Sequence, residues 1–113
     1  MCTSMYFYFC PSESPKIAPF TFPSEIVDEG SYVQVSCSVI KGDEPLRITW
    51  HLQGAEVSSE PSLSTTMIGT RSSILIITNV GYRHAGVYTC RAQNLAGVAT
   101  YSDELRVNGK IGV

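Results

Sequence analysis

Apolar and polar residues alternate in three separated stretches of this chain, at 35–39, 48–52 and 88–92. Alternation with a period of two predicts β-strands that each bury one face. The apolar positions of the three stretches are Val35, Cys37 and Val39, then Ile48, Trp50 and Leu52, then Tyr88, Cys90 and Ala92. Two cysteines that point inward from different strands can meet across a core roughly 10 Å thick. The pattern therefore predicts a disulfide between Cys37 and Cys90, with the Trp50 indole packed beside it.

The order of four residues gives a second indication of the fold. Cys37 is followed by Trp50 and then by Tyr88 and Cys90, so that a tyrosine stands two residues before the second cysteine. This order is typical of the immunoglobulin fold, in which that tyrosine bonds back to the backbone of the preceding turn. We expect an all-β, two-sheet immunoglobulin-like sandwich of the I-set type with Greek-key connections. Its core should contain Trp50, Tyr88 and Leu75.

Turn residues divide the chain into the expected strands. We predict a proline-containing edge strand at 17–23 that crosses between the sheets and continues at 25–28. The further strands are predicted at 32–40, 46–53, 63–68, 73–78, 86–93 and 98–107. The stretch 58–62 contains Pro61 and leaves little room for the two extra strands of a variable-type domain. We also expect positive φ at Gly30, a left-handed Gly97 in the hairpin at 94–97, and a bulge at 101–103.

The two ends of the chain do not follow this pattern. Residues 1–16 are predicted to be a disordered extension, residues 17–109 the domain, and residues 110–113 a tail. The run Met5–Phe9 resembles the core of a signal peptide, but it is short and no lysine or arginine precedes it. A leader fragment or a local disulfide between Cys2 and Cys10 is the alternative to disorder. We expect both ends to be arbitrary boundaries within a longer protein.

Length and charge narrow the class of protein. A chain of 113 residues suits one domain. The formal net charge is −2 and there is no block of basic residues, which argues against a nucleic-acid partner. No apolar run approaches 20 residues, so we expect no membrane span or direct membrane contact in this segment. The expected disulfide predicts an extracellular location, as part of a cell-surface or secreted protein.

No constellation of catalytic or metal-binding residues is apparent in the sequence. His51 and His84 fall on separate elements, with no serine or cysteine nucleophile evidently placed beside either, so we expect both to be surface histidines. Asp43-Glu44 and Asp103-Glu104 lack the spacing of a calcium-binding loop. We therefore expect no enzyme, no cofactor and no catalytic, cofactor-binding or metal residues.

Four stretches of the chain resemble one family of adhesion proteins. The segments 17–22, 37–50, 71–77 and 96–109 are similar to domains of the arthropod Down syndrome cell adhesion molecule (Dscam) family, most of all its alternatively spliced seventh immunoglobulin domain. In the broad immunoglobulin pattern an aspartate stands at the position of His84, and it can pair with an arginine. Neutral His84 cannot form that ion pair, so Arg71 needs another partner. The resemblance implies a cell-surface protein with tandem domains and homophilic, isoform-specific self-recognition.

The predicted strands also indicate where binding would occur. If Leu75 and Ile77 point inward, Ile74 and Ile76 point outward from the sheet formed by the first, second, fourth and fifth main strands (A, B, D and E). Exposed apolar patches often mark contact surfaces. The candidate interface residues are Tyr32, Gln34, Ser36, Ser64, Thr66, Ile74 and Ile76. We expect this A-B-E-D sheet to pair antiparallel with a second copy of itself across a two-fold axis, with flanking immunoglobulin domains on either side in a longer chain.

Two other functions share this fold. One is an immune-type receptor that binds a foreign ligand through loops such as 41–44 and 94–97. The other is a structural intracellular domain of the muscle type, in which Cys37 and Cys90 would remain reduced or be dispensable.

Overall fold

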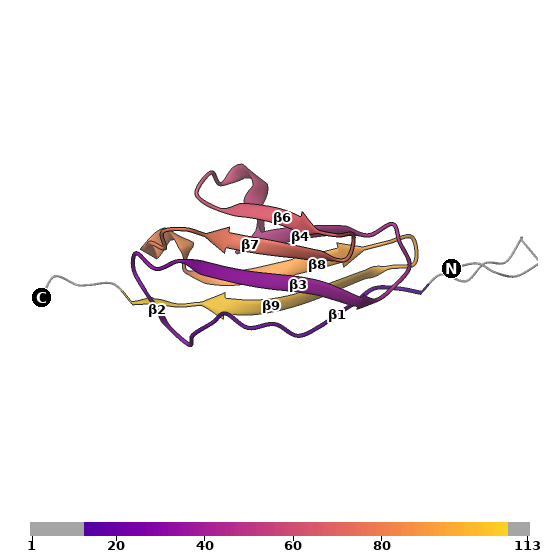
Figure 1. The fold of residues 1–113 in the computed structure, drawn as a ribbon, viewed down its shortest axis with the longest axis horizontal. Helices are drawn as coiled ribbons and strands as arrows, with labels where there is room; N and C mark the ends of the chain where they lie inside the picture. The colour runs from indigo at the N-terminus through magenta and orange to yellow at the C-terminus, as the bar shows by residue number, and fades with distance from the viewer. Residues whose placement is uncertain (1–12, 109–113) are drawn as a thin grey trace, which may run out of the picture.

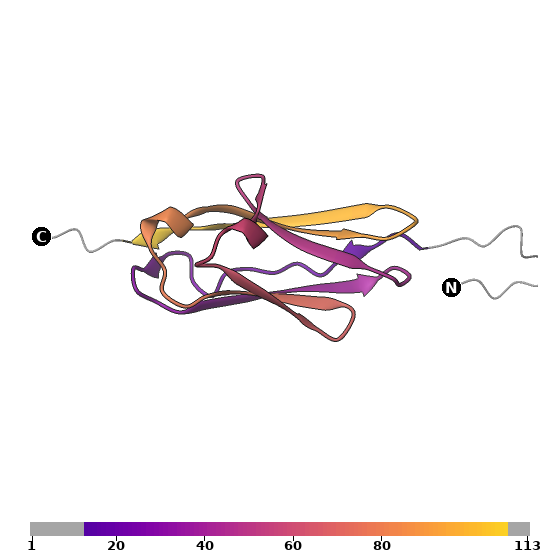
Figure 2. The same cartoon turned by 90° about the horizontal axis from the view of Figure 1, so that it is seen from above.

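Two β-sheets pack face to face around one core (Figure 1), and both layers are visible from above (Figure 2). The structure is a computed structural model that describes residues 13–108, apart from the side chain of residue 59. The strands of the first sheet are, in order, β1 (Lys16–Ile17), β3 (Val33–Lys41), β7 (Ser72–Ile77) and β6 (Ser64–Ile68). Those of the second are β5 (Ala55–Glu56), β4 (Arg47–Leu52), β8 (Gly86–Gln93) and β9 (Val98–Leu105). The other elements are β2 (Val27–Asp28), β10 (Val107–Asn108) and the short 3-10 helices η1 (Val57–Ser59) and η2 (Tyr82–His84).

This arrangement confirms the predicted immunoglobulin-like sandwich. The residues of β3 alternate between buried and solvent-facing positions, as a strand with one face on a core requires. Its partner β7 buries Ser73, Leu75 and Ile77 and leaves Ile74 and Ile76 half-buried on the outer face. The two strands are antiparallel, with Val35 opposite Leu75 and Ser36 opposite Ile74. The phase assigned to the 73–78 strand from the sequence is therefore correct.

The core is built around the disulfide and the tryptophan. Cys37 and Cys90 are joined by an S–S bond and both side chains are fully buried. Trp50 is only 2% exposed, and its Nε1–H donates to Ser73 Oγ of the facing sheet at 3.1 Å. The hydrogen bond satisfies the one polar atom of the indole, which would otherwise be costly to bury.

The first predicted strand divides between two partners. β1 pairs antiparallel with β3, whereas β2 runs parallel to β10 at the end of the chain. Between them, Phe20 packs against Trp50 with ring centroids 5.3 Å apart, and Phe22 packs against Tyr88 at 5.4 Å. These two rings pack the irregular segment onto the core, and the Ala18 and Phe22 amides hold it further by donating to the Ser38 carbonyl and to Asp103 Oδ2, each at 2.9 Å.

One short strand was not predicted, and two local predictions about the later strands are wrong. The strand β5 follows β4 and pairs with it, just before the stretch 58–62 that was expected to be a loop. The pairing of β9 with β8 continues without a bulge through 101–103, and the break in the last strand falls instead at Arg106. Gly97 is not in the left-handed region, and the hairpin is closed by hydrogen bonds that the Ala96 and Gly97 amides donate to Asn94 Oδ1. Gly30 has the expected positive φ, of 92°.

The predicted start of the domain at residue 17 is too late. Lys16 already belongs to β1, Pro15 is buried, and the backbone amide of Glu13 donates to Asp43 at 3.0 Å. Residues 1–12 and 109–113 lie outside the described part of the chain. The expectations for Cys2, Cys10, Met5–Phe9 and the tail at 110–113 therefore remain predictions.

Candidate interaction surface

The outer face of the β1-β3-β7-β6 sheet brings together the residues that the sequence singled out as an interface. Ile74 stands between Ser36 of β3 and Thr66 of β6, and Ile76 stands between Gln34 and Ser64 in the same way. All four of these polar neighbours are exposed. The result is a short apolar ridge along β7, with an amide and a hydroxyl on the β3 side and two hydroxyls on the β6 side.

Three further exposed apolar residues extend this face. Tyr32 is 57% exposed, and its hydroxyl donates to Gln34 Oε1 at 3.0 Å. Ile40 and Ile68 are 54% and 56% exposed, near the end of the face where β7 begins. Both isoleucines share the outward phase of their strands and were missed by sequence reasoning. Continuing the alternation of outward positions to the ends of the two predicted strands would have found them.

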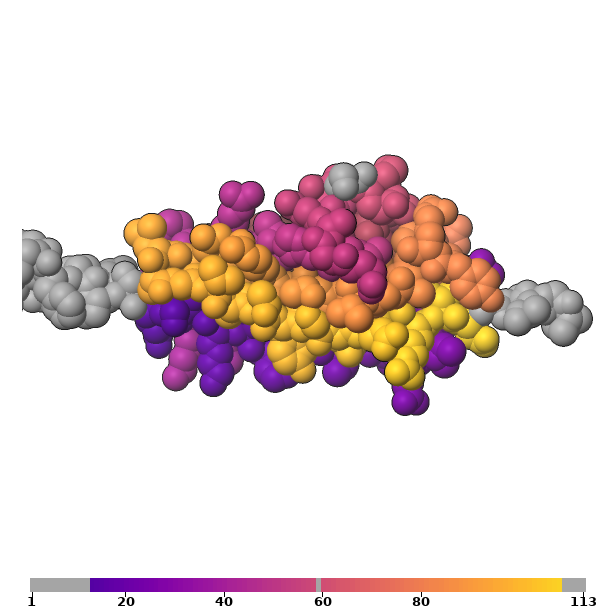
Figure 3. Space-filling view, turned by 180° about the vertical axis from the view of Figure 1, so that it is seen from behind, coloured from indigo at the N-terminus to yellow at the C-terminus, as the bar shows by residue number. Residues whose placement is uncertain are grey.

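The outward positions of β3, β6 and β7 carry no charge. These positions are Gln34, Ser36, Ser38 and Ile40 on β3, Ser64, Thr66 and Ile68 on β6, and Ser72, Ile74 and Ile76 on β7. The outer face of the other sheet, seen from behind in Figure 3, differs because it presents Arg47, Arg91 and Glu104 between its hydroxyl-bearing residues. The outward positions of β3, β6 and β7 are thus uncharged, unlike those of the opposite sheet. The exposed lysines of the first sheet, Lys16 of β1 and Lys41 at the end of β3, pair opposite each other at the β1 edge.

His84 is buried at the corner between β7 and β8, which contradicts its prediction as a surface residue. Only 1% of it is exposed. The backbone N–H of Gly81 donates to Nδ1 at 2.9 Å, so the ring proton of the neutral imidazole lies on Nε2. Nε2–H then donates to Ser62 Oγ at 2.8 Å, and Ser62 donates to Glu60 Oε1 at 2.8 Å. Because Nδ1 accepts a hydrogen bond and carries no proton, the His84 ring is neutral.

This serine beside a histidine was not expected from the sequence, yet it is not arranged for catalysis. A catalytic histidine accepts the serine proton on Nε2 and donates from Nδ1 to a carboxylate. Here Nδ1 is already an acceptor, Nε2 is a donor, and the carboxylate of Glu60 lies on the serine side. Hydrogen bonds from the Ser62 amide and hydroxyl also hold the pKa of Glu60 below its ordinary value. The group is a structural brace between the start of β6 and the corner.

The corner tyrosine behaves as the fold requires. Tyr88 is fully buried and its hydroxyl donates to the His84 carbonyl at 2.6 Å. Burial is the main reason that its pKa lies far above 10, with the Glu60 charge adding to the effect. The hydroxyl therefore stays protonated and keeps its role as a donor.

Arg71 finds partners at the opposite end of β7 from His84. It precedes β7 and His84 follows it, so an arginine at position 71 is not placed to pair with position 84. Its guanidinium donates to the carbonyls of Val39 and Gly42 at 3.1 and 2.9 Å, and it forms an exposed ion pair with Glu44 at 3.4 Å. The expectation that Arg71 needs another partner is confirmed.

Other chemistry was looked for in the part of the chain that the structure describes. Within residues 13–108, no group of three or more His, Cys, Asp or Glu side chains is placed to hold a metal ion. No helix in this range has the length and apolar character needed to cross a membrane. His51 lies half-buried on the outer face of β4, where its Nε2 is 3.0 Å from Thr49 Oγ1.

Comparison with known proteins places this architecture in a family. Residues 14–94 match the model of the immunoglobulin domain. The chain belongs to the immunoglobulin domain family. This immunoglobulin domain is 39% identical over 95 residues to the cell adhesion molecule Dscam1 of Drosophila melanogaster. The match covers 83% of this chain and 5% of Dscam1. The chain thus spans about a twentieth of the length of that curated relative.

Solved structures give the same family resemblance. The crystal structure of the Dscam1 Ig7 domain, isoform 5, superposes with a TM-score of 0.81 at 36% identity, covering 84% of this chain and 97% of that one. The titin I-band fragment I67–I69 superposes with a TM-score of 0.77 at 26% identity, covering 86% of this immunoglobulin domain and 33% of the fragment. The predicted resemblance to the seventh Dscam domain is confirmed.

Proposed function

We propose that this domain is an extracellular adhesion module that pairs with a second copy of itself through the outer face of the β1-β3-β7-β6 sheet. The observation that carries the proposal is the neutral, apolar-centred surface around Ile74 and Ile76. The similarity to Dscam1, a cell adhesion molecule, supports the class of function. No catalytic role and no cofactor belong to this proposal.

Absence of charge is what suits this face to self-pairing. In a two-fold interface the same patch lies on both partners, so each residue near the axis meets its own copy. A charged residue there would oppose a like charge, which costs binding energy unless it is offset. The outward positions of β3, β6 and β7 avoid this cost, whereas Arg47 and Arg91 on the other sheet would incur it.

Specificity between copies would come from the polar strips. Gln34, Ser36, Ser64 and Thr66 flank the apolar ridge and must match their counterparts in hydrogen bonding across the interface. A polar group that is buried without a partner costs about 1–3 kcal/mol, so a changed residue here penalises mismatched pairs. An interface of ordinary size buries about 800 Å² per partner. Flanking immunoglobulin domains in a longer chain would add avidity to a weak single contact.

The titin likeness raises the muscle-type structural domain as a second candidate. The identity of 26% to that fragment is lower than the 36% to the Dscam1 Ig7 domain. The buried disulfide also favours an oxidising, extracellular location, since cytosolic proteins rarely keep one. Adhesion outside the cell is therefore the better-supported proposal.

Sedimentation of an Ile76→Asp variant tests the proposal. A carboxylate in the middle of the ridge would be buried opposite its own copy, so the dimer dissociation constant should rise by about 100-fold or more. The measurement is analytical ultracentrifugation over a range of concentrations up to the millimolar level.

Val87→Asp is the matched control for this variant. Val87 is 42% exposed on β8, in the outer face of the opposite sheet, so its replacement introduces the same charge away from the proposed contact. The control should dimerise like the unmodified chain. If Val87→Asp abolished dimerisation and Ile76→Asp retained it, the contact would lie on the opposite sheet, and the proposal would be wrong.

A further inference from the structure

The two sheets have four edges between them, and three of these edges are protected against pairing with another strand. β1 and β5 are only two residues long, and each includes a charged residue. β9 is longer, but it carries Asp103 and Glu104. The segment before β2 also runs beside it, because the Phe22 amide donates to Asp103 Oδ2 at 2.9 Å. Short length, charge and cover are the usual means by which proteins keep an edge from pairing.

The fourth edge, β6, has none of these protections. Its five residues, Ser64–Ile68, are uncharged, include no proline and are all exposed. One side of the strand pairs with β7, and the other side is the end of the sheet, at the top of the view in Figure 1. Within residues 13–108, the strand makes no backbone hydrogen bond beyond that pairing. Since alternate amides and carbonyls of an antiparallel strand point away from its partner, β6 offers a row of free donors and acceptors.

Two apolar side chains accompany this free edge. Met67 lies opposite the buried Ser73, so it is on the core side of the sheet, yet it is 45% exposed. Ile68 is on the outer face and is 56% exposed. A strand added beyond β6 would cover part of both side chains.

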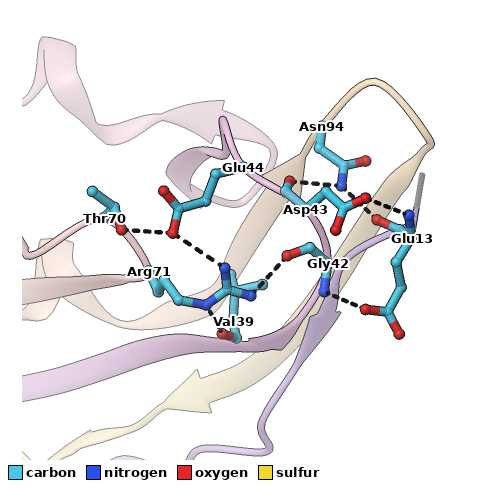
Figure 4. A network of polar contacts seen from close by, with 8 residues as sticks. All are labelled: Glu13, Val39, Gly42, Asp43, Glu44, Thr70, Arg71 and Asn94. Carbon is cyan, nitrogen blue, oxygen red and sulfur yellow. Dashed lines mark hydrogen bonds and ion pairs between the residues drawn. The ribbon is translucent and has the colours of Figure 1, made fainter. Parts of the chain in front are cut away.

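Both ends of β6 are held in place by polar contacts. Before the strand, Ser62 is bonded to the buried His84 at 2.8 Å. After the strand, Thr70 and Arg71 both donate to the Glu44 carboxylate, as Figure 4 shows. The edge is therefore already ordered, and a partner strand would lose little entropy in fixing it.

We propose that β6 pairs antiparallel with β6 of a second copy, which joins two β1-β3-β7-β6 sheets into one sheet of eight strands. The strand sequence suits a second copy as the occupant. With a two-fold axis at Thr66, that residue meets its own copy, Thr65 meets Met67, and Ser64 meets Ile68. Every residue of the strand then has a partner, and no like charges oppose each other.

Edge pairing would change how the domain presents its outer face. The two-fold axis is perpendicular to the sheet, so the outer faces of both copies point in the same direction. Ile74 lies opposite Thr66, so three strand spacings, about 14 Å, separate the two Ile74 residues. The pair would thus bind an opposed pair through two faces at once, with a gain in avidity. This consequence rests on the proposed function, whereas the strand pairing rests on β6 alone.

Cross-linking of a Thr66→Cys variant tests the pairing. The variant is made in the Ile76→Asp background, which removes the proposed face contact and leaves the weaker edge contact to be measured alone. On the two-fold axis the Cβ atoms of residue 66 lie about 5 Å apart, which allows a disulfide after a small shift. Under mild oxidation at about millimolar concentration, mass spectrometry of proteolytic fragments should find the bridge between the two copies.

Ile68→Cys in the same background is the matched control. Position 68 is exposed on the same strand, but in the proposed register it lies about 13 Å from its own copy. Its bridge between copies should be at least tenfold less abundant than the bridge at position 66.

Charges at positions 65 and 67 test the register. Thr65 and Met67 lie opposite the buried Leu75 and Ser73, so changes there leave the outer face intact. Thr65→Lys with Met67→Lys sets lysine opposite lysine twice, and should reduce the bridge at position 66 at least tenfold. Thr65→Lys with Met67→Glu sets lysine opposite glutamate and should retain it, which also controls for the effect of two substitutions on folding.

Two results would overturn the edge pairing. One is a bridge at position 66 no more abundant than that at position 68, and the other is equal cross-linking in the two double variants. Neither result bears on the outer face. Sedimentation of Ile76→Asp against the unmodified chain judges the proposed function separately.

Discussion

At the scale of single residues, the protonation state of the buried His84 imidazole links the stability of the fold to pH. Burial is the main cause that lowers its pKa below the ordinary value of 6.5; the neighbouring Arg83 charge lowers it further, and Glu60 opposes this. Protonation would also place a proton on Nδ1, where the Gly81 amide already donates. The folded domain therefore favours the neutral ring.

Acidification should destabilise the fold through His84. Because the folded pKa is lower than the unfolded one, the neutral ring contributes its full stabilisation above about pH 6.5, and this is lost as pH falls below that value. Urea midpoints measured between pH 8 and pH 5 should show the decline. A His84→Gln variant should have a flatter profile than the unmodified chain. An unaltered slope in His84→Gln would contradict the assignment.

At the scale of the elements, the loop between β3 and β4 depends on a glycine at position 42. Gly42 has a φ of 121°, which side-chain-bearing residues rarely adopt, and it packs against Pro15. Two independent constraints therefore act on this one residue. Through Gly42, the end of β3 is packed against Pro15, just before β1.

Gly42→Ala should destabilise the domain by more than strained backbone alone explains. The backbone conformation costs about 1–3 kcal/mol, and the clash with Pro15 adds to it. Gly54→Ala is a matched comparison, because Gly54 has a φ of 87° and no atom within 4 Å of the position where its Cβ would lie. Thermal unfolding of both variants checks the difference. Equal losses would show that the contact with Pro15 contributes nothing.

The strands could be predicted wherever burial alone decides the pattern. β3, β7 and β8 each have one face on the core, so alternation in the sequence located them to within one or two residues and oriented Ile74 and Ile76 correctly. The apolar centre of the candidate surface followed from that phase. The fold class followed from the spacing of Cys37 and Cys90 around Trp50.

Features that depend on polar contacts between distant segments could not be predicted in this way. His84 is buried because Gly81 and Ser62 satisfy both of its nitrogens, and no hydrophobic pattern records such partners. The start of the domain was misplaced because Glu13 is held by Asp43 and Asn94, 30 and 81 residues away. Ile40 and Ile68 were missed for a different reason, because the alternation was not followed to the ends of their strands.

At the scale of the whole molecule, the disulfide links the two sheets. Cys37 on β3 and Cys90 on β8 are separated by 53 residues. A cross-link over a loop of this length restricts the unfolded chain and stabilises the fold by roughly 4 kcal/mol in the chain-entropy model. That is a large part of a total stability of about 5–15 kcal/mol.

Removal of the disulfide should lower stability sharply. The double variant Cys37→Ala and Cys90→Ala is expected to lose about 2–5 kcal/mol of unfolding free energy. Urea denaturation of this variant, and of the unmodified chain with and without reductant, provides the measurement. Reductant should lower the midpoint of the unmodified chain and leave that of the double variant in place. An insensitive unmodified chain would show that the bond is absent or unimportant in solution.

The parallel pairing of β2 with β10 determines how the domain responds to mechanical tension. The described chain begins and ends at opposite poles (Figure 1), so a pull between them draws β2 one way and β10 the other. The strands then slide along each other instead of peeling apart. The bonds from the Val27 amide to the Arg106 carbonyl and from the Glu29 amide to the Asn108 carbonyl must therefore rupture together. The proposed contact on the outer face of the β1-β3-β7-β6 sheet would then carry a stretching force while the sandwich behind it stays folded.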